Sequence, residues 1–226
     1  MEIKKIGQLK TLFPTKFGVP RQSGVSKSST ATLVFEEEYR SPEAFVGLEG
    51  YSHVWVIWGF SEAKYGEFSP TVRPPRLGGN KRVGVFASRS PYRPNSLALS
   101  VLKIEGIEKT EKDGHVLHLS GADMMDGSPV YDVKPYIPFA DSIPDALGGF
   151  TENLEDYILD VTIPCEIEKL IEPELLPCLI EALKNDPRPS YIDDPNRVFG
   201  FFYDKYEVKF KVEGKNLTVV SIEKIK

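Results

Sequence analysis

Residues 54–58 read Val-Trp-Val-Ile-Trp, a run of β-branched and aromatic residues with no turn-forming residue inside it. Residues 115–119 read His-Val-Leu-His-Leu, a second short run in which apolar residues dominate. Short runs rich in β-branched, aromatic and other apolar residues, bounded by turn residues, are typical of strands. Both runs therefore predict strands, and they decide the fold class that we expect for the first two-thirds of the chain.

Similar segments occur on both sides of these two runs, and turn residues such as Gly79-Asn80 and Asp113-Gly114 separate them. Several short strands with turn signals between them are typical of a closed barrel or a sandwich. One short helix is expected to begin at Ser41, with this serine as N-cap and Pro42 in the first helical position. The six predicted strands cover residues 2–9, 31–35, 52–60, 82–87, 97–107 and 115–120.

The remainder of the chain has a different pattern. Residues 134–149 contain three prolines and end in Gly-Gly, which predicts an ordered arm or linker. Apolar residues recur at helical spacing in residues 165–184, but two prolines there predict a kink or two short helices. Residues 206–212 and 217–224 alternate around a Glu-Gly-Lys-Asn turn and predict a hairpin.

The chain is therefore expected to be mainly β, with two domains. Residues 1–148 form a β-barrel in this interpretation, and residues 149–226 form a small α+β domain. A chain of 226 residues with 41% hydrophobic and 27% charged residues can bury a sizeable core.

The cellular compartment expected from the sequence is the cytoplasm. No apolar run reaches the roughly 18 residues that would span a bilayer, and the opening residues lack the apolar region of a secretory signal. The two cysteines, Cys165 and Cys178, are expected to be reduced thiols, since disulfides persist mainly in exported proteins.

Basic residues are concentrated in residues 70–95, which read PTVRPPRLGGNKRVGVFASRSPYRPN without one acidic side chain, although the net charge of the chain is -5. An arginine held between prolines has already lost conformational entropy, so it can bind a phosphate or carboxylate at little further cost. This stretch predicts an anion-binding site, and the alternative interpretation is a solvated basic loop.

Several familiar kinds of active site are not indicated. His115 and His118 are three residues apart on a predicted strand and point to opposite faces, and no third ligand has suitable spacing, so we expect no metal site. His53 opens a strand, and a partly buried strand histidine explains it as well as any functional role. No serine nucleophile elbow and no GxGxxG after a strand is present, which argues against a Rossmann cofactor site.

Four segments combine loop-forming residues with polar groups: VPRQ at 19–22, the arginine-rich stretch, DMMDGSPV at 123–130, and DPRPSY at 186–191. Taken singly, the first segment can be an ordinary exposed loop and the second a solvated basic loop. The third can be a simple hairpin turn and the fourth a linker. Their order is more specific. VPRQ, TVRPPRLGGN, VGVFASRSPYRPN, DGSPVYDVKPYIP and DPRPSY together closely resemble the TsaA-like family, also called TrmO, of S-adenosylmethionine-dependent tRNA methyltransferases, and the resemblance covers nearly the whole chain.

The resemblance implies a fold, a reaction and a cofactor site. Family members use a β-barrel cofactor site and methylate N6 of threonylcarbamoyladenosine at position 37 of tRNA, next to the anticodon; a homodimer is also implied. Arg89 would hold the methionine carboxylate, and Met124 and Met125 would pack on the adenine, although core filling explains these two equally well. The implied cofactor-binding residues are Pro20, Arg21, Gln22, Ser61, Glu62, Arg89, Leu99, Met124, Met125, Asp126 and Gly127.

The acceptor nitrogen N6 lies in a urea-like link and is a poor nucleophile, so a base should help to remove its proton. Asp126 and Asp132 are the candidates, and the sequence does not decide between them. The fixed arginines suit an RNA backbone, and an aromatic side chain suits a splayed base. The residues expected to bind tRNA are Arg73, Arg76, Arg93, Asn95, Lys134, Tyr136, Arg188 and Tyr191.

Two positions depart from the family pattern. Ser61-Glu62 stand where members often have histidine, and Ala98 stands where they often have glycine, whose missing Cβ permits close backbone approach. Two other functions stay open on the sequence: an RNA-binding barrel without catalysis, and a methyltransferase acting on a small phosphorylated molecule.

Overall fold

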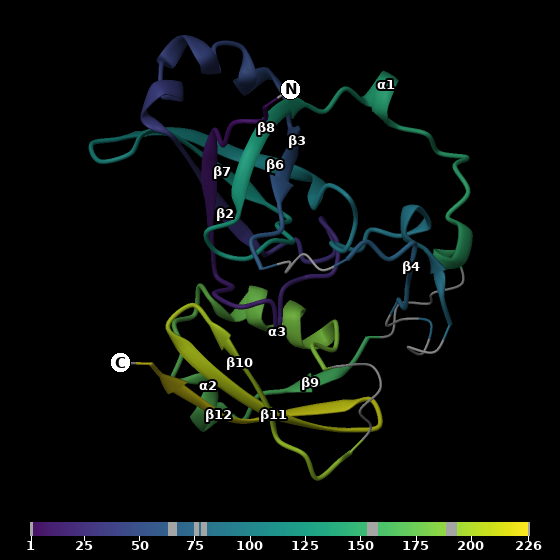
Figure 1. The fold of residues 1–226 in the computed structure, drawn as a ribbon. Helices are drawn as coiled ribbons and strands as arrows, with labels where there is room; N and C mark the ends of the chain where they lie inside the picture. The colour runs from purple at the N-terminus through teal and green to yellow at the C-terminus, as the bar shows by residue number, and fades with distance from the viewer. Residues whose placement is uncertain are drawn as a thin grey trace.

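The computed structural model describes residues 2–62, 67–74, 77, 81–152, 158–188 and 194–225. A closed barrel forms the upper body in Figure 1 and a four-stranded sheet forms the lower one, with helix α3 (Leu176–Lys184) between them. The mainly β fold class expected from the sequence is confirmed.

Six antiparallel strands close the barrel in the order β1-β2-β7-β6-β3-β8. Inward-facing apolar side chains alternate along them and fill the interior; Leu9, Val56 and Leu102, for example, are fully buried. The strands are β1 (Gly7–Thr11), β2 (Thr30–Phe35), β3 (His53–Gly59), β6 (Leu97–Thr110), β7 (Gly114–Ser120) and β8 (Pro129–Pro135).

The barrel closes where β1 meets β8, and this seam is short. Only Gly7↔Val130 and Gln8↔Pro129 are paired there, whereas the pairing of β3 with β6 runs from His53↔Lys103 to Gly59↔Leu97. Strand β8 was not among the strands expected from the sequence. It begins with Pro129, and proline, which has no N–H, is tolerated as the first residue of a strand. Because proline and the residues before it are also typical of turns, the sequence pattern did not indicate a strand here.

The strand expected at residues 82–87 was largely wrong. Only β5 (Val83–Gly84) is extended, and it pairs with β4 (Thr71–Val72) in a small hairpin outside the barrel. A 3₁₀ turn, η5 (Val85–Ala87), follows. The helix expected after Ser41 is likewise a 3₁₀ turn, η2 (Pro42–Phe45), with η1 (Glu37–Tyr39) and η3 (Leu48–Gly50) on either side.

The second body is a sheet with the order β10-β11-β12-β9, in which β9 is parallel to β12. The predicted hairpin of β11 and β12 is confirmed, and the helical region consists of two short helices, as its prolines allowed. Strands β9 and β10 were not expected. The elements are β9 (Asp160–Thr162), α2 (Cys165–Glu168), α3, β10 (Phe199–Tyr203), β11 (Tyr206–Glu213) and β12 (Asn216–Lys224).

A segment from the N-terminal part completes the core of this second body. Phe13 is fully buried there, and its ring centroid lies 5.7 Å from that of Tyr203. The backbone N–H of Asp204 donates to the carbonyl oxygen of Leu12 at 2.7 Å. Residues 12–19 therefore link the barrel to the sheet, a contact that a division of the chain at residue 148 does not show.

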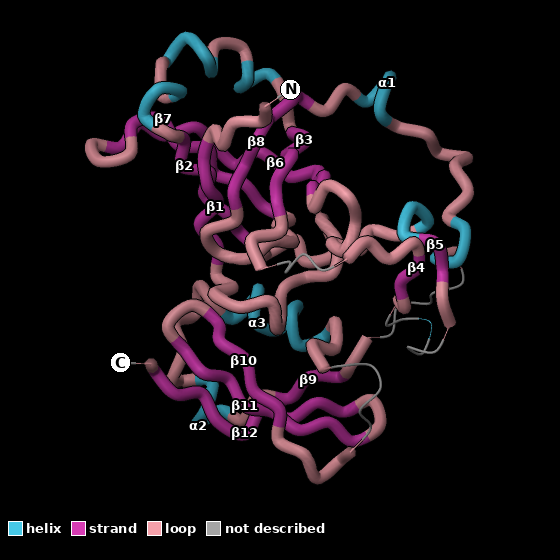
Figure 2. The backbone as a smooth tube through the Cα atoms, in the orientation of Figure 1, coloured by secondary structure: helices cyan, strands magenta, loops and turns pink. Residues whose placement is uncertain are grey.

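The arm after β8 runs outside the barrel, as Figure 2 shows, through α1 (Pro138–Asp141) and η6 (Gly149–Thr151). Asp141 fixes its start, because its Oδ2 accepts hydrogen bonds from Trp55 Nε1 at 3.0 Å and from the backbone N–H of Ile137 at 2.8 Å. Phe139 and Leu147 on this arm are about nine-tenths exposed.

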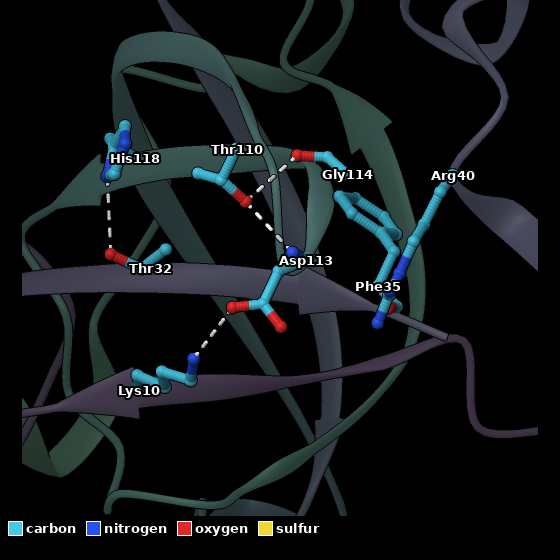
Figure 3. Close-up of polar contacts among 8 residues, drawn as sticks. All are labelled: Lys10, Thr32, Phe35, Arg40, Thr110, Asp113, Gly114 and His118. Atoms are coloured by element: carbon cyan, nitrogen blue, oxygen red, sulfur yellow. Dashed lines mark hydrogen bonds and ion pairs between the residues drawn. The ribbon is translucent and has the colours of Figure 1, made fainter. Parts of the chain in front are cut away.

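Polar contacts join the outer surfaces of β1, β2 and the β6–β7 turn (Figure 3). Lys10 Nζ lies 3.2 Å from Asp113 Oδ2, and Thr32 Oγ1 lies 3.2 Å from His118 Nδ1. The other ring nitrogen of His118 lies 2.8 Å from Glu108 Oε2. This histidine therefore stabilises the barrel surface through side-chain contacts.

Candidate cofactor and tRNA site

The loop of residues 20–29 brings the VPRQ segment against the arginine-rich segment; it is named the cofactor loop because the sequence resemblance predicts a cofactor contact there. Arg89 Nη1 donates a hydrogen bond to Gln22 Oε1. The backbone N–H of Gly24 donates to the carbonyl oxygen of Gly121 at 3.0 Å, which fixes the loop against the end of β7. Arg89 and Gln22 are both exposed, so their polar groups face solvent at one end of the barrel.

Asp123 lies beside this loop, and the sequence did not single it out. Its Oδ1 accepts a hydrogen bond from Ser100 Oγ at 2.6 Å, and this hydroxyl accepts one from Trp58 Nε1 at 2.9 Å. Burial raises the pKa of the Asp123 carboxyl, while hydrogen bonds from Ser100 and the backbone of Ser23 and the charge of Arg89 act in the opposite direction. The carboxylate thus joins β6, the cofactor loop and Arg89.

The loop that carries Arg89 is held by its own hydrogen bonds. Arg93 Nη1 donates to the carbonyl oxygen of Ser88 at 3.0 Å, and Ser96 Oγ donates to that of Pro91 at 2.6 Å. Arg93, predicted to bind tRNA, therefore also braces this loop.

Two of the other residues predicted to contact tRNA, Arg73 and Asn95, are exposed to solvent. Arg76 and Tyr191 lie outside the described residues.

Asp126 and Gly127 line a different hollow, a cleft of about 370 Å³ that also contains Lys10 of β1 and Asp204 of the second body. Asp126 Oδ1 accepts a hydrogen bond from the backbone N–H of Thr11 at 2.9 Å. The neighbouring Met124 is 1% exposed and packs in the barrel core, so core filling accounts for it, whereas Met125 is partly buried.

A third set of predicted site residues lies on the outer face of β6, β3 and β8. Ile57 pairs with Leu99 on one side and with Asp132 on the other, and Leu99 is 52% exposed. Lys134 Nζ lies 2.9 Å from Asp132 Oδ2. The ring of Tyr136 packs 5.7 Å from that of Trp55, one of the outward residues of β3.

Ser61 and Glu62 are exposed in the turn after β3, and Pro20 is buried at the start of the cofactor loop. The described residues therefore bring Gln22, Arg89 and Asp123 together, while Leu99 and Asp132 share a neighbouring strand face.

The direct tRNA contact predicted for Arg188 does not agree with its surroundings. Its side chain is 7% exposed, and Nε and Nη2 each lie 2.9 Å from an Asp186 carboxylate oxygen. The carbonyl oxygen of Asp186 in turn accepts a hydrogen bond from Arg21 Nη2 at 3.1 Å. In this conformation Arg188 holds the turn at Asp186, because a buried guanidinium that forms a forked ion pair cannot also reach out to a phosphate.

The sequence matches two family models, the tRNA-methyltransferase O N-terminal domain over residues 8–142 and the TrmO C-terminal domain over residues 160–225. The chain belongs to the tRNA-methyltransferase O family. Together the two models cover both bodies of the structure, so the resemblance read from the sequence motifs is confirmed.

Individual TrmO relatives support the assignment. A tRNA (adenine(37)-N6)-methyltransferase of Escherichia coli is 35% identical over 98% of this chain and 97% of its own length. One from Eikenella corrodens is 46% identical over 72% of this chain and 92% of its own length. The crystal structure of TrmO from Pseudomonas aeruginosa superposes with a TM-score of 0.77 at 29% identity, covering 99% of this chain and 98% of that one.

Two further findings concern metal ligands and membrane-spanning helices in this TrmO family member. Among the described residues, no group of three or more His, Cys, Asp and Glu side chains could hold a metal ion. No helix within the same residues is long and apolar enough to cross a membrane.

Proposed function

We propose that this protein transfers a methyl group from S-adenosylmethionine to N6 of threonylcarbamoyladenosine at position 37 of tRNA. The observation that carries the proposal is the contact of Arg89 with Gln22 beside the partly buried carboxylate of Asp123, in a chain that both TrmO models match. The E. coli relative is named for methylation of adenine 37, and a P. aeruginosa relative, 36% identical over 88% of this chain, is named a putative S-adenosylmethionine-dependent methyltransferase.

The side chains of this group suit the polar end of the cofactor. The guanidinium of Arg89 offers paired donors to a carboxylate, while Asp123 and the amide oxygen of Gln22 offer acceptors to an ammonium group. Exposed Leu99 offers apolar surface. The cofactor itself supplies a methyl group activated on a sulfonium sulfur, so the chief task of these residues is to bind and orient.

Removal of the proton from N6 needs an acceptor, and we assign it to Asp132. Asp132 lies in the row of Ile57 and Leu99, on the face where Tyr136 packs, whereas Asp126 lines the separate cleft beside β1. Lys134 Nζ lies 2.9 Å from Asp132 Oδ2 and helps to hold this carboxylate in place on that face.

For tRNA we retain Arg73, Asn95, Lys134 and Tyr136 from the described residues, all of them exposed or partly exposed. Basic side chains in braced loops can hold an RNA backbone with little ordering on binding. Arg93 keeps a share in this role beside its structural one, and Arg76 and Tyr191 stay as expectations from the sequence.

The functional unit that we propose is a homodimer acting in the cytoplasm. The exposed apolar side chains of the arm, Phe139, Ile143 and Leu147, support it, because large apolar side chains left in solvent are available to an interface. Light scattering of the purified protein measures the mass directly, and a monomer would contradict this part of the proposal.

The reaction is tested with labelled S-adenosylmethionine and two forms of one tRNA, with and without threonylcarbamoyladenosine. Label only in the modified tRNA, on that nucleoside, is the expected result. Cofactor binding without label in either tRNA would point to another acceptor, and competition by small phosphorylated molecules would identify that class. Failure to bind the cofactor would leave a non-catalytic RNA-binding barrel.

A further inference from the structure

The cofactor loop contacts the second body of the protein as well as the barrel. It leaves the barrel after β1, carries Arg21 and Gln22, and returns as β2. On the barrel side it is fixed by the contacts of Gln22 with Arg89 and of Gly24 with Gly121. Its opposite side lies against α3 and the turn that follows α3, which belong to the second body (Figure 1).

Glu181 of α3 makes the first of these contacts. Its Oε2 accepts hydrogen bonds from Ser26 Oγ at 2.7 Å and from the backbone N–H of Ser28 at 2.9 Å, and its Oε1 accepts one from Ser28 Oγ at 3.2 Å. Ser26 is fully buried. Burial alone would raise the pKa of the Glu181 carboxyl, but these hydrogen bonds hold that pKa below its ordinary value. The carboxyl is therefore ionised and a strong hydrogen-bond acceptor at neutral pH.

The turn after α3 makes the second contact, through Asp186. This residue has φ of 48°, a left-handed conformation that is uncommon outside glycine. The backbone N–H of Asp186 donates to the carbonyl oxygen of Leu183 in α3, and the guanidinium of Arg188 donates to both oxygens of its carboxylate. These contacts hold the turn from both sides. The carbonyl oxygen is thereby aimed at Arg21, which donates to it at 3.1 Å.

We propose that α3 and its C-terminal turn set the conformation of the cofactor loop, with Glu181 and Asp186 as positioning residues for S-adenosylmethionine. The inference rests on the proposed function, since it takes the loop to hold the cofactor. Neither residue need touch the cofactor. They act through Ser26, Ser28 and Arg21, so the second body of the protein also prepares the cofactor site.

The test compares Glu181→Ala, Glu181→Gln and Glu174→Ala by calorimetric titration with S-adenosylmethionine and by steady-state methyl transfer. Glu174 is an exposed carboxylate just before α3 and serves as the matched control. Removing the acceptor of a charged hydrogen bond leaves Ser26 and the Ser28 backbone unpaired, so Glu181→Ala should raise the Kd for the cofactor about tenfold. Glutamine keeps one oxygen acceptor and should restore a large part of the affinity, and the control should match wild type.

The kinetic result separates positioning from a general loss of fold. Glu181→Ala should raise KM for the cofactor about tenfold while kcat at saturating cofactor and KM for tRNA stay within about twofold of wild type. Equal cofactor affinity in wild type and Glu181→Ala, or equal rises in both KM values, would overturn the inference.

Ser28→Ala changes the same contact from the loop side and carries the test if Glu181→Ala does not fold. Combined with Glu181→Ala it should add less than its separate effect, as expected for two halves of one contact. Fully additive effects would overturn the inference. Wild-type protein that binds no cofactor would defeat the proposed function itself, a result distinct from wild-type binding that the variants leave unchanged.

Discussion

Replacing Phe13 with alanine should destabilise the second body of the protein, although Phe13 is near the N-terminus. Its side chain is fully buried among residues of α3, β10 and β11, and its ring meets Tyr203 edge-on at 5.7 Å. Truncation of a buried phenylalanine costs about 3–5 kcal/mol, of which an aromatic pair supplies about 1 kcal/mol. A loss of about 4 kcal/mol should lower amide protection roughly a thousandfold where exchange requires unfolding of this body.

Hydrogen exchange followed by mass spectrometry measures this effect strand by strand. Peptides from β10–β12 should lose protection in Phe13→Ala, while Phe202→Ala, on the same sheet but 40% exposed, should change it by less than about tenfold. Both tryptophans lie in β3, so fluorescence follows barrel unfolding separately. Unchanged protection of β10–β12 in Phe13→Ala would refute the reasoning that the N-terminal segment is part of this core.

Three other substitutions test separate contacts. Arg89→Ala should weaken S-adenosylmethionine binding by about a hundredfold, the loss expected for a charged hydrogen-bond donor; calorimetry that gives equal affinity would contradict it. Gly18→Ala should lower Tm, because φ is 88° and a Cβ would lie 2.5 Å from the ring of Phe201; an unchanged melting curve would show that the segment can shift. Hydrogen bonding to Lys205 lowers the pKa of Glu172 to about 2. The stability from this contact is therefore present above the ordinary pKa of 4.5 and lost as pH falls toward 2, so the Tm advantage of wild type over Glu172→Gln should shrink between pH 5 and 3.

The sequence predicted the strands whose side chains alternate or form an apolar run and missed those that lack these signals. β3 and the β11–β12 hairpin bury largely alternate residues, and β7 is a short apolar run between turn residues; all were recognised. β8 begins with proline inside a turn-rich motif, and β9 has three residues and is stabilised by pairing with β12, a contact distant in sequence. At residues 82–87 the apolar pattern is real, but Gly84 ends the strand and Phe86 is 75% exposed.

The sequence indicated which segments contribute to the candidate site, but it did not indicate every side chain that lies there. The motifs placed Gln22 and Arg89 in one site, and the structure joins them by a hydrogen bond. Asp123 was overlooked because its partners, Ser100 and Trp58, come from distant strands and give no local pattern. The sequence predicted a tRNA contact for Arg188, and it could not show that this arginine is enclosed and paired with its own neighbour, Asp186.

The short seam between β1 and β8 makes one side of the barrel the easiest to open. Two residue pairs join these strands, flanked by backbone hydrogen bonds from Ile6 to Val130 and from Leu9 to Ser128, and parting them would leave two unsatisfied strand edges. Exposed edges recruit strands from other molecules, so brief openings at this seam are a route to self-association on heating or at high concentration. Pro129 at the start of β8 offers no N–H to an incoming strand, and it therefore guards one end of the exposed edge against aggregation.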